Sequence, residues 1–235
     1  MKKYIALVFL SFLIVGCNLI SKEKVEYQKT FHKNGKVFTV TPIVEGKAHG
    51  IKKEYYDTGA IRLEVPYESG VVQGKVKFYH PDGKLYSETP RVNGLIEGIV
   101  RKYHTNGNLL SETPYHNNKV QPGLREFDEK GKLRDPYTLS FSTSKAKHLK
   151  DLRVLLDVSI SQNMRSIKFY QQIHDEDNNP MYVAMPTKEG VGQLMVVLPE
   201  GAFIEKRIVI KAEFVTMYNS RGVVIGDYLL KVSNL

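Results

Sequence analysis

The chain has 235 residues, of which 42% are hydrophobic and 25% are charged, the composition of an ordinary folded protein. Its formal net charge is +9 at pH 7, and its single Cys excludes an intramolecular disulfide and a Cys-rich zinc site. The 14 Tyr and 10 Phe favour β structure, and the composition excludes a polytopic membrane protein, a coiled coil and a disulfide-rich miniprotein.

The first residues of the chain predict a targeting segment. Met1-Lys2-Lys3 is basic, and Ile5 to Val15 is almost wholly apolar. This run is much shorter than the roughly 20 residues of a membrane-spanning helix, but it is typical of the core of a signal peptide. It ends in Ile14-Val15-Gly16-Cys17, which resembles a bacterial lipobox. The resemblance implies a lipoprotein signal peptide at 1–16, lipid attachment at Cys17 and a tether at 17–26.

The anchor determines where the protein is expected to reside. Acyl chains contribute about 0.8 kcal/mol per buried CH₂, so several of them hold a protein stably on a membrane. Asn18, not Asp, follows Cys17, and by resemblance to proteobacterial sorting rules this favours the outer membrane. We therefore expect a lipid-anchored protein of the bacterial cell envelope, on the periplasmic face of the outer membrane. The alternative is an ordinary signal peptide with a chance Cys.

A repeat of 24 residues fills residues 27–135. A lead glycine recurs at this step, with an aromatic residue four positions before it and an aliphatic residue two positions after it in all five copies. The lead glycines are Gly35, Gly59, Gly83, Gly107 and Gly131. Dipeptides such as Asn34-Gly35 predict hairpin turns, and Glu45-Gly46 and its equivalents predict the opposite turns. Each repeat is therefore predicted to form two antiparallel strands of an elongated meander.

The best copy of this pattern runs Tyr55-Tyr56…Gly59-Ala60-Ile61 and closes with Gly70…Gly74. It resembles the MORN repeat-variant family, whose members are linked to lipid binding or protein assembly, and some of which are described as antitoxin-like. The copies differ from this pattern in two ways. Histidines replace Tyr56 in three copies, and the last copy lacks the closing glycines. These histidines are His32, His80 and His104.

A row of basic residues recurs six positions before each lead glycine, and a row of glutamates recurs five positions after three of them. A two-residue loop would pair Lys77 with Glu88, whereas a three-residue loop would pair Tyr79 with Leu85. Because a one-residue slip turns side chains to the other face, the two pairings are expected to exclude each other. We favour the second, which places basic and aromatic rows on one face and the glutamates on the other.

That face is the candidate binding strip. Its residues are Lys53, Lys77, Arg101, Tyr55, Tyr79 and Tyr103. The strip suits an anionic lipid, a glycan or an acidic partner. Alternatively, the basic side chains cover the sheet and pair with nearby carboxylates, which contributes little binding. Metal is not expected as a ligand, since equivalent histidines of neighbouring repeats would lie about 10 Å apart. Nucleic acid is not expected either, because neither half of the chain carries a high positive charge.

Residues 136–235 lose the repeat and are predicted to form a second β domain. Seven short apolar segments separated by turns indicate a β-sandwich of immunoglobulin-like size. The alternative is a smaller open sheet with a helix at Ser144 to Leu156. Asp175, Asp177 and Asn179 alternate like the first ligands of a calcium loop, but Pro180 replaces the loop glycine, which favours a plain hairpin turn.

The predicted fold is therefore all-β: an elongated antiparallel meander of MORN-type hairpin repeats followed by a β-sandwich-like domain. No nucleophile, phosphate loop or carboxylate pair stands at a spacing that indicates catalysis, so we expect no enzyme and no cofactor. The predicted function is a membrane-anchored, non-enzymatic binding or scaffold module with an unknown protein or anionic envelope ligand as partner. The alternatives are an anionic lipid or glycan binder, and an antitoxin-like or hydrolase-associated protein.

Overall fold

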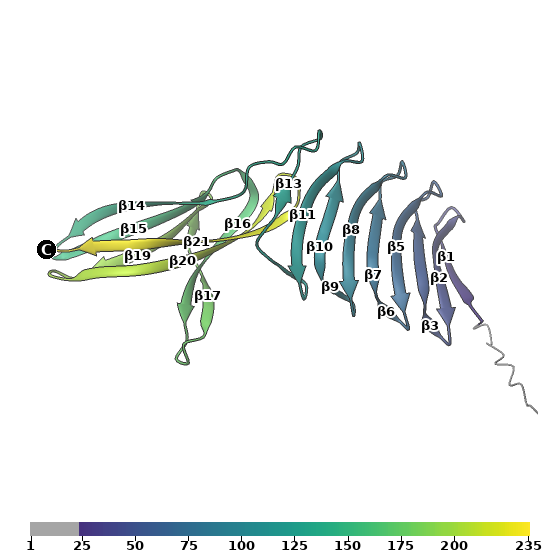
Figure 1. The fold of residues 1–235 in the computed structure, drawn as a ribbon, viewed down its shortest axis with the longest axis horizontal. Coiled ribbons are helices and arrows are strands. Elements are labelled where there is room, and N and C mark those ends of the chain that lie inside the picture. Colours follow the sequence, from purple (N-terminus) through teal and green to yellow (C-terminus); the bar gives the residue numbers. More distant parts are fainter. Residues whose placement is uncertain (1–23) are drawn as a thin grey trace, which may run out of the picture.

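The computed structural model describes residues 24–235, and these form strands and turns with no helix. One sheet has 13 strands, and two further sheets have four each (Figure 1). The all-β prediction is confirmed, including the meander and the sandwich that follows it. The predicted signal peptide and Cys17 lie outside the described residues.

The repeat sheet is an antiparallel meander in which neighbours in the sequence are mostly neighbours in the sheet. Its strands are β1 (Glu26–Phe31), β2 (Val37–Val44), β3 (Lys47–Ala48), β4 (Gly50–Tyr55), β5 (Ile61–Glu68), β6 (Val71–Val72), β7 (Gly74–Tyr79), β8 (Leu85–Val92), β9 (Leu95–Ile96), β10 (Gly98–Tyr103), β11 (Leu109–His116), β12 (Lys119–Val120) and β13 (Arg125–Glu126). The two-residue strands β3, β6, β9 and β12 lengthen the hairpins at one edge of the meander.

The turn at each lead glycine is a three-residue loop followed by a bulge. In the third repeat Gly83 has φ +85°, and its N–H donates to the His80 carbonyl at 2.9 Å. Beyond the loop, Tyr79 pairs with Leu85, while Lys77 pairs with Glu88. Our expectation that these two pairings exclude each other is wrong. The register shifts by one residue between them, because a bulge inserts an extra residue into one strand.

The opposite turns are two-residue hairpins. In Ser69-Gly70 both residues have positive φ, 48° and 89°, as a type I′ turn requires. A glycine closes each repeat beside a proline: Gly74 has φ +105°, and a Cβ there would lie 3.3 Å from Pro66 Cγ. In the fourth copy Gly123, with φ +110°, occupies the equivalent place, shifted along the chain by one residue. The closing glycine of the fourth copy is thus displaced from the expected position, Pro122. The fifth copy, led by Gly131, has Ser142 and Ala146 at the two closing positions and lacks the closing glycines, as predicted.

The second part of the chain is a sandwich of two four-stranded sheets. Its strands are β14 (Leu139–His148), β15 (Asp151–Ile160), β16 (Met164–His174), β17 (Pro180–Ala184), β18 (Thr187–Lys188), β19 (Val191–Leu198), β20 (Phe203–Thr216) and β21 (Arg221–Ser233). The sheet orders β14-β15-β19-β18 and β17-β16-β20-β21 follow the A-B-E-D and C-F-G order of immunoglobulin domains, with β17 added beside the C strand.

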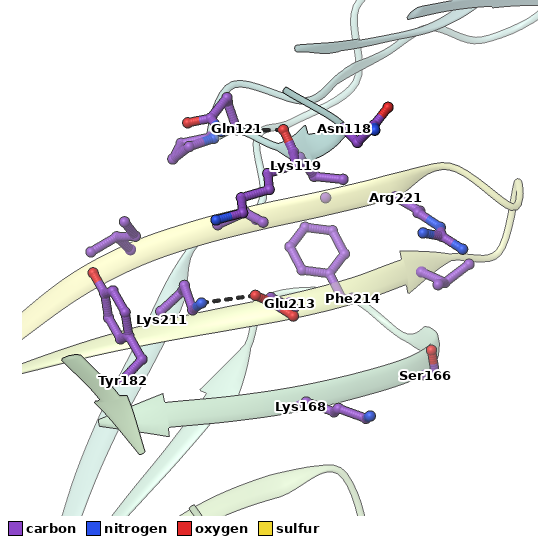
Figure 2. A pocket seen from close by; sticks show the side chains of 16 residues that line it. Asn118, Lys119, Gln121, Ser166, Lys168, Tyr182, Lys211, Glu213, Phe214 and Arg221 are labelled. Carbon is purple, nitrogen blue, oxygen red and sulfur yellow. Dashed lines mark hydrogen bonds and ion pairs between the residues drawn. The ribbon is translucent and has the colours of Figure 1, made fainter. Parts of the chain in front are cut away.

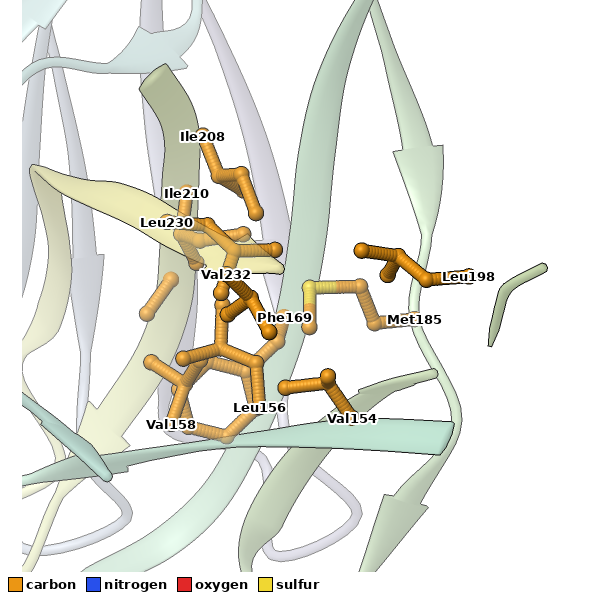
Figure 3. Packing of buried hydrophobic residues seen from close by; sticks show 11 residues of the cluster. Val154, Leu156, Val158, Phe169, Met185, Leu198, Ile208, Ile210, Leu230 and Val232 are labelled. Carbon is orange, nitrogen blue, oxygen red and sulfur yellow. The ribbon is translucent and has the colours of Figure 1, made fainter. Parts of the chain in front are cut away.

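The sandwich holds the main apolar core of the described residues. Val154, Leu156 and Val158 alternate inward along β15 and are fully buried, facing Phe169 and Ile210 of the other sheet (Figure 3). These residues were predicted as strand or helix, and the helix is wrong, because strands β14 and β15 pair through the whole of the segment concerned. The inward alternation of β-branched and aliphatic residues is typical of a strand and not of a helix.

The Asp175 segment is the hairpin turn between β16 and β17. Asp175 Oδ1 accepts from the backbone N–H groups of Asp177 at 3.0 Å and Asn179 at 2.8 Å. These hydrogen bonds, first of all the one from Asn179, hold the pKa of Asp175 below its ordinary value. The carboxylate thus stabilises the turn, as the favoured interpretation of the sequence predicts.

The tip of the β20–β21 hairpin reaches the last strands of the repeat sheet (Figure 1). Thr216 Oγ1 donates to Glu126 Oε1 at 2.7 Å, and the Ser220 hydroxyl donates to the Ser111 hydroxyl at 2.9 Å. Ser111 pairs with both Lys102 and Glu126, so these three side chains share one face of the repeat sheet. We call this the docking face, because the sandwich contacts the repeats here.

Candidate functional site

The predicted strip lies on the face opposite the docking face, which we call the tyrosine face. Alternation along β7 places Lys77 and Tyr79 together, and Tyr79 Oη donates to Glu64 Oε2 at 2.9 Å. Lys53 stands directly opposite Glu64. The glutamate row therefore lies on the tyrosine face, and our expectation that it lies on the other face is wrong. The bulge beside each lead glycine is the reason, since it keeps both pairings on one face.

Two of the three charges of the strip, those of Lys53 and Arg101, are paired with this glutamate row. Lys53 Nζ lies 3.6 Å from Glu64 Oε1, and Arg101 Nε lies 3.0 Å from Glu112 Oε1. Lys75, on the same strand as Lys77, lies 2.8 Å from Glu88. Partly exposed pairs of this kind contribute about 0–1 kcal/mol each. The row is thus a charge-compensated ladder, and a binding role for its six predicted residues stays a prediction.

The tyrosines of the strip are half-buried between neighbouring strands. Burial, together with the hydrogen bond to the Glu64 carboxylate, raises the pKa of Tyr79 to about 12. Burial likewise raises the pKa of Tyr103 above its ordinary value. Both side chains therefore stay neutral at physiological pH and act as hydrogen-bonding and apolar surface.

The exposed apolar side chains of the repeat strands follow a simple rule. By strand alternation and pairing, every exposed large apolar residue of strands β1 to β13 lies on the tyrosine face. They are Tyr27, Phe31, Ile51, Val71, Val92, Leu95 and Ile99. On the docking face, by contrast, Val65, Ser111 and Thr113 are buried. The two faces thus differ in what they offer to a partner.

Tyr56 and two of the three histidines that replace it, His32 and His104, join neighbouring repeats. Tyr56 Oη donates to the Tyr79 carbonyl at 2.7 Å, and His104 Nε2 lies 3.0 Å from the Phe127 carbonyl. His32 makes the same contact to Tyr55 at 2.9 Å. Tyr and His can both present a donor at the end of a flat ring, which explains why either residue serves at this position. Within residues 24–235, no group of three or more His, Cys, Asp or Glu could hold a metal ion.

A second candidate site, which the sequence did not reveal, lies between the two parts of the chain. A groove of about 630 Å³ separates residues 118–122 of the last repeat from the outer face of the sheet of β16, β17, β20 and β21 (Figure 2). Basic side chains line it, and Lys211 Nζ pairs with Glu213 Oε1 at 2.8 Å. Lys211 also stands over the ring of Tyr182, 4.4 Å from its centroid.

The fold and the two faces define the class of the protein: a β-repeat protein with an appended immunoglobulin-like sandwich. The model of the MORN repeat variant family matches residues 48–69, 72–93 and 96–117, three segments that follow one another at the 24-residue step. The predicted resemblance is confirmed for these three copies. No curated protein sequence and no solved structure matches the chain.

Membrane attachment rests on the sequence alone. In the part of the chain that the structure describes, no helix has the length and apolar character needed to cross a membrane. The predicted anchor, Cys17, precedes that part.

Proposed function

We propose that the chain is a lipid-anchored, non-enzymatic binding scaffold of the bacterial envelope, attached at Cys17, with the tyrosine face as its binding surface. The observation that carries the proposal is the asymmetry of the repeat sheet. The exposed large apolar residues of its strands all lie on the tyrosine face, whereas the sandwich contacts the docking face. A protein partner is the best match for such a face.

The composition of the tyrosine face supports a protein partner. Interfaces are enriched in aromatic residues and Arg around a partly apolar centre, and here Ile51 and Ile99 flank Lys53 and Arg101 along their strands. Equivalent residues recur at about 10 Å, so the face offers a regular series of contacts. Because the glutamate row neutralises much of the basic row, an anionic lipid or glycan is a weaker match.

The anchor places this surface close to a membrane. The segment from Cys17 to the start of β1 at Glu26 spans at most about 30 Å when extended. Incorporation of a labelled fatty acid tests the anchor: the parent chain should be labelled, and Cys17→Ser should abolish the label. A labelled Cys17→Ser chain would show that the lipobox interpretation is wrong.

The binding surface can be tested by photo-crosslinking in cells. A photoreactive residue at Ile51 or Ile99 should give one discrete product, whereas the same residue at Met195 should not. Met195 is a matched control because it is 57% exposed and lies on the sandwich, away from the tyrosine face. Equal products from all three positions would mean that the tyrosine face is not a specific surface.

The basic row can be tested on the same product. The triple variant Lys53→Gln, Lys77→Gln, Arg101→Gln removes three positive charges from the strip and should weaken crosslinking at Ile51. Glu64 loses its ion-pair partner in this variant, whereas Glu88 keeps Lys75 and Glu112 keeps Arg125. Undiminished crosslinking would show that these three residues only stabilise the sheet. Salt-sensitive binding of the chain without its anchor to vesicles of anionic phospholipid would instead favour the lipid-binding alternative.

A further inference from the structure

The groove between the last repeat and the sandwich is built from elements that are far apart in the sequence. Its floor is formed by side chains that alternate outward from β16, β20 and β21, among them Lys168, Lys211 and Arg221. Its wall is the segment 118–122, which includes β12 and from which Lys119 extends toward β21 (Figure 2). The groove therefore exists only because the sandwich docks on the repeats.

The charge inside this groove is unbalanced. Four basic side chains line it, and the one carboxylate among the lining residues, Glu213, is already paired with Lys211. None of Lys119, Lys168 and Arg221 forms an ion pair with a described residue. The excess of positive charge is therefore not neutralised within residues 24–235.

A neighbouring cavity adds a fifth cation. It has a volume of about 270 Å³, shares Val215 and Arg221 with the groove, and is lined by Lys102. Burial lowers the pKa of Lys102 below its ordinary value, and the Arg221 charge acts in the same direction, against a contribution from Glu126 that raises it. Gathering like charges in a partly buried place costs stability unless an anion compensates them.

We propose that this groove binds a small polyanion, a ligand with at least two phosphate or carboxylate groups. Arg221 offers a planar fork that suits either group, and Lys119 and Lys168 offer point charges from the wall and from the floor. Tyr182 and Gln121, which also line the groove, provide a ring surface and an amide for the uncharged part of the ligand.

The size of the groove favours a small ligand over a macromolecule. Its volume of about 630 Å³ falls within the roughly 300–1,000 Å³ range of small-molecule sites. The ligand would contact the repeat sheet and the sandwich at once, so it stabilises their docking. Binding should therefore raise the melting temperature, and added salt should weaken it. This site is separate from the tyrosine face, and its failure would leave the proposed function untouched.

The test is calorimetric titration of the chain lacking residues 1–23 with inorganic pyrophosphate, and separately with citrate, at low ionic strength. The two probes distinguish phosphate from carboxylate recognition. The variant Lys168→Gln, Arg221→Gln should bind the recognised probe about tenfold more weakly or worse. The matched control is Lys147→Gln, Lys206→Gln, which removes the same charge from exposed residues outside the groove and should bind like the parent.

Each outcome decides the proposal. Binding of either probe that is lost in the groove variant and kept in the control supports it. The proposal is overturned if neither probe binds, or if binding is weakened equally in the groove variant and the control variant. It is also overturned if a poly-glutamate peptide binds whereas neither pyrophosphate nor citrate does. If the double variant does not fold, as judged by its melting temperature, the single variant Lys168→Gln is used instead. It should fold like the parent, because Lys168 is exposed and forms no ion pair with a described residue.

Discussion

Replacing Glu126 with Ala should lower the free energy of unfolding by about 2–4 kcal/mol, because this side chain joins the two parts of the protein. Glu126 is only 2% exposed. Its carboxylate accepts from Thr216 Oγ1 at 2.7 Å and from Tyr137 Oη at 2.5 Å. Without it, two hydroxyls lose their acceptor at a cost of about 1–3 kcal/mol each, part of which is recovered because a desolvated carboxylate disappears.

A double-mutant cycle with Thr216→Val isolates the contact across the junction. Val has nearly the shape of Thr but no hydroxyl, so Thr216→Val removes the donor to Glu126. It also removes an acceptor from the backbone N–H groups of Tyr218 and Ser220, each at 3.2 Å. These backbone losses occur with or without Glu126 and largely cancel in the cycle. We expect a coupling energy of about 1–2 kcal/mol between Glu126 and Thr216.

The assay is urea unfolding followed by far-UV circular dichroism, since the chain has no Trp to report by fluorescence. Glu129→Ala is the control: Glu129 is exposed three residues away, and its change should stay within about 0.5 kcal/mol. If the effects of Glu126→Ala and Thr216→Val simply add, the two side chains do not interact. The docking of the hairpin tip on the repeat sheet would then be wrong.

Three further predictions concern the repeats. Gly83→Val should lower the free energy of unfolding by about 1–2 kcal/mol, and Gly83→Asn by clearly less. No atom lies within 4 Å of a Cβ placed at Gly83, so the whole cost comes from its φ of +85°, which Asn tolerates better. Equal melting temperatures of the two variants would contradict this. Tyr56→Phe should cost about 0.5–1.5 kcal/mol in urea unfolding by removing one bond between repeats, whereas Tyr67→Phe, which removes no such bond, should cost less. Stability should be full below about pH 10 and fall as the pH rises from about 10 to about 12, because the pKa of Tyr79 is raised from 10.0 to about 12 in the folded state. The urea midpoint should therefore drop between about pH 9 and about pH 11, and a drop of the same size in Tyr79→Phe would exclude Tyr79 as its cause.

The repeat could be predicted from the sequence because its physics is local. A turn glycine needs positive φ wherever it stands, so Gly83 and its equivalents reveal the hairpins directly. The bulged register of the hairpins could also have been predicted from the sequence. In a regular antiparallel pair the two residue numbers add to a constant, and the pairs Tyr79–Leu85 and Lys77–Glu88 differ by one in that sum. Two favourable pairings whose registers differ by one residue indicate a bulge between them, so that both can form in the same hairpin.

The junction and the groove could not be predicted in this way, because they depend on contacts that follow no period. Glu126 and Thr216 are 90 residues apart, and Ser111 and Ser220 are 109 apart. In the sequence, a Glu, Thr or Ser that is buried cannot be distinguished from an exposed one, because its hydrogen-bond partner is known only from the fold. The closing glycine of the fourth copy illustrates the same limit. Gly123 stands one residue beyond the 24-residue step and is recognised only by its φ and by its place beside Pro114.

The two end strands of the repeat sheet have different surroundings, and this asymmetry is relevant to the proposed scaffold role. At the C-terminal end the β20–β21 hairpin docks on the last strands, and its polar contacts compensate Glu126 and Ser111. At the other end β1 pairs only with β2, and all six of its residues are exposed. Charged residues such as Lys29 on this edge oppose pairing with another sheet. Each repeat adds about 10 Å between β1 and the sandwich, because two strands of about 4.8 Å spacing make one repeat. The number of repeats thus determines how far the sandwich and its basic groove stand from β1, at the N-terminal end of the repeat sheet.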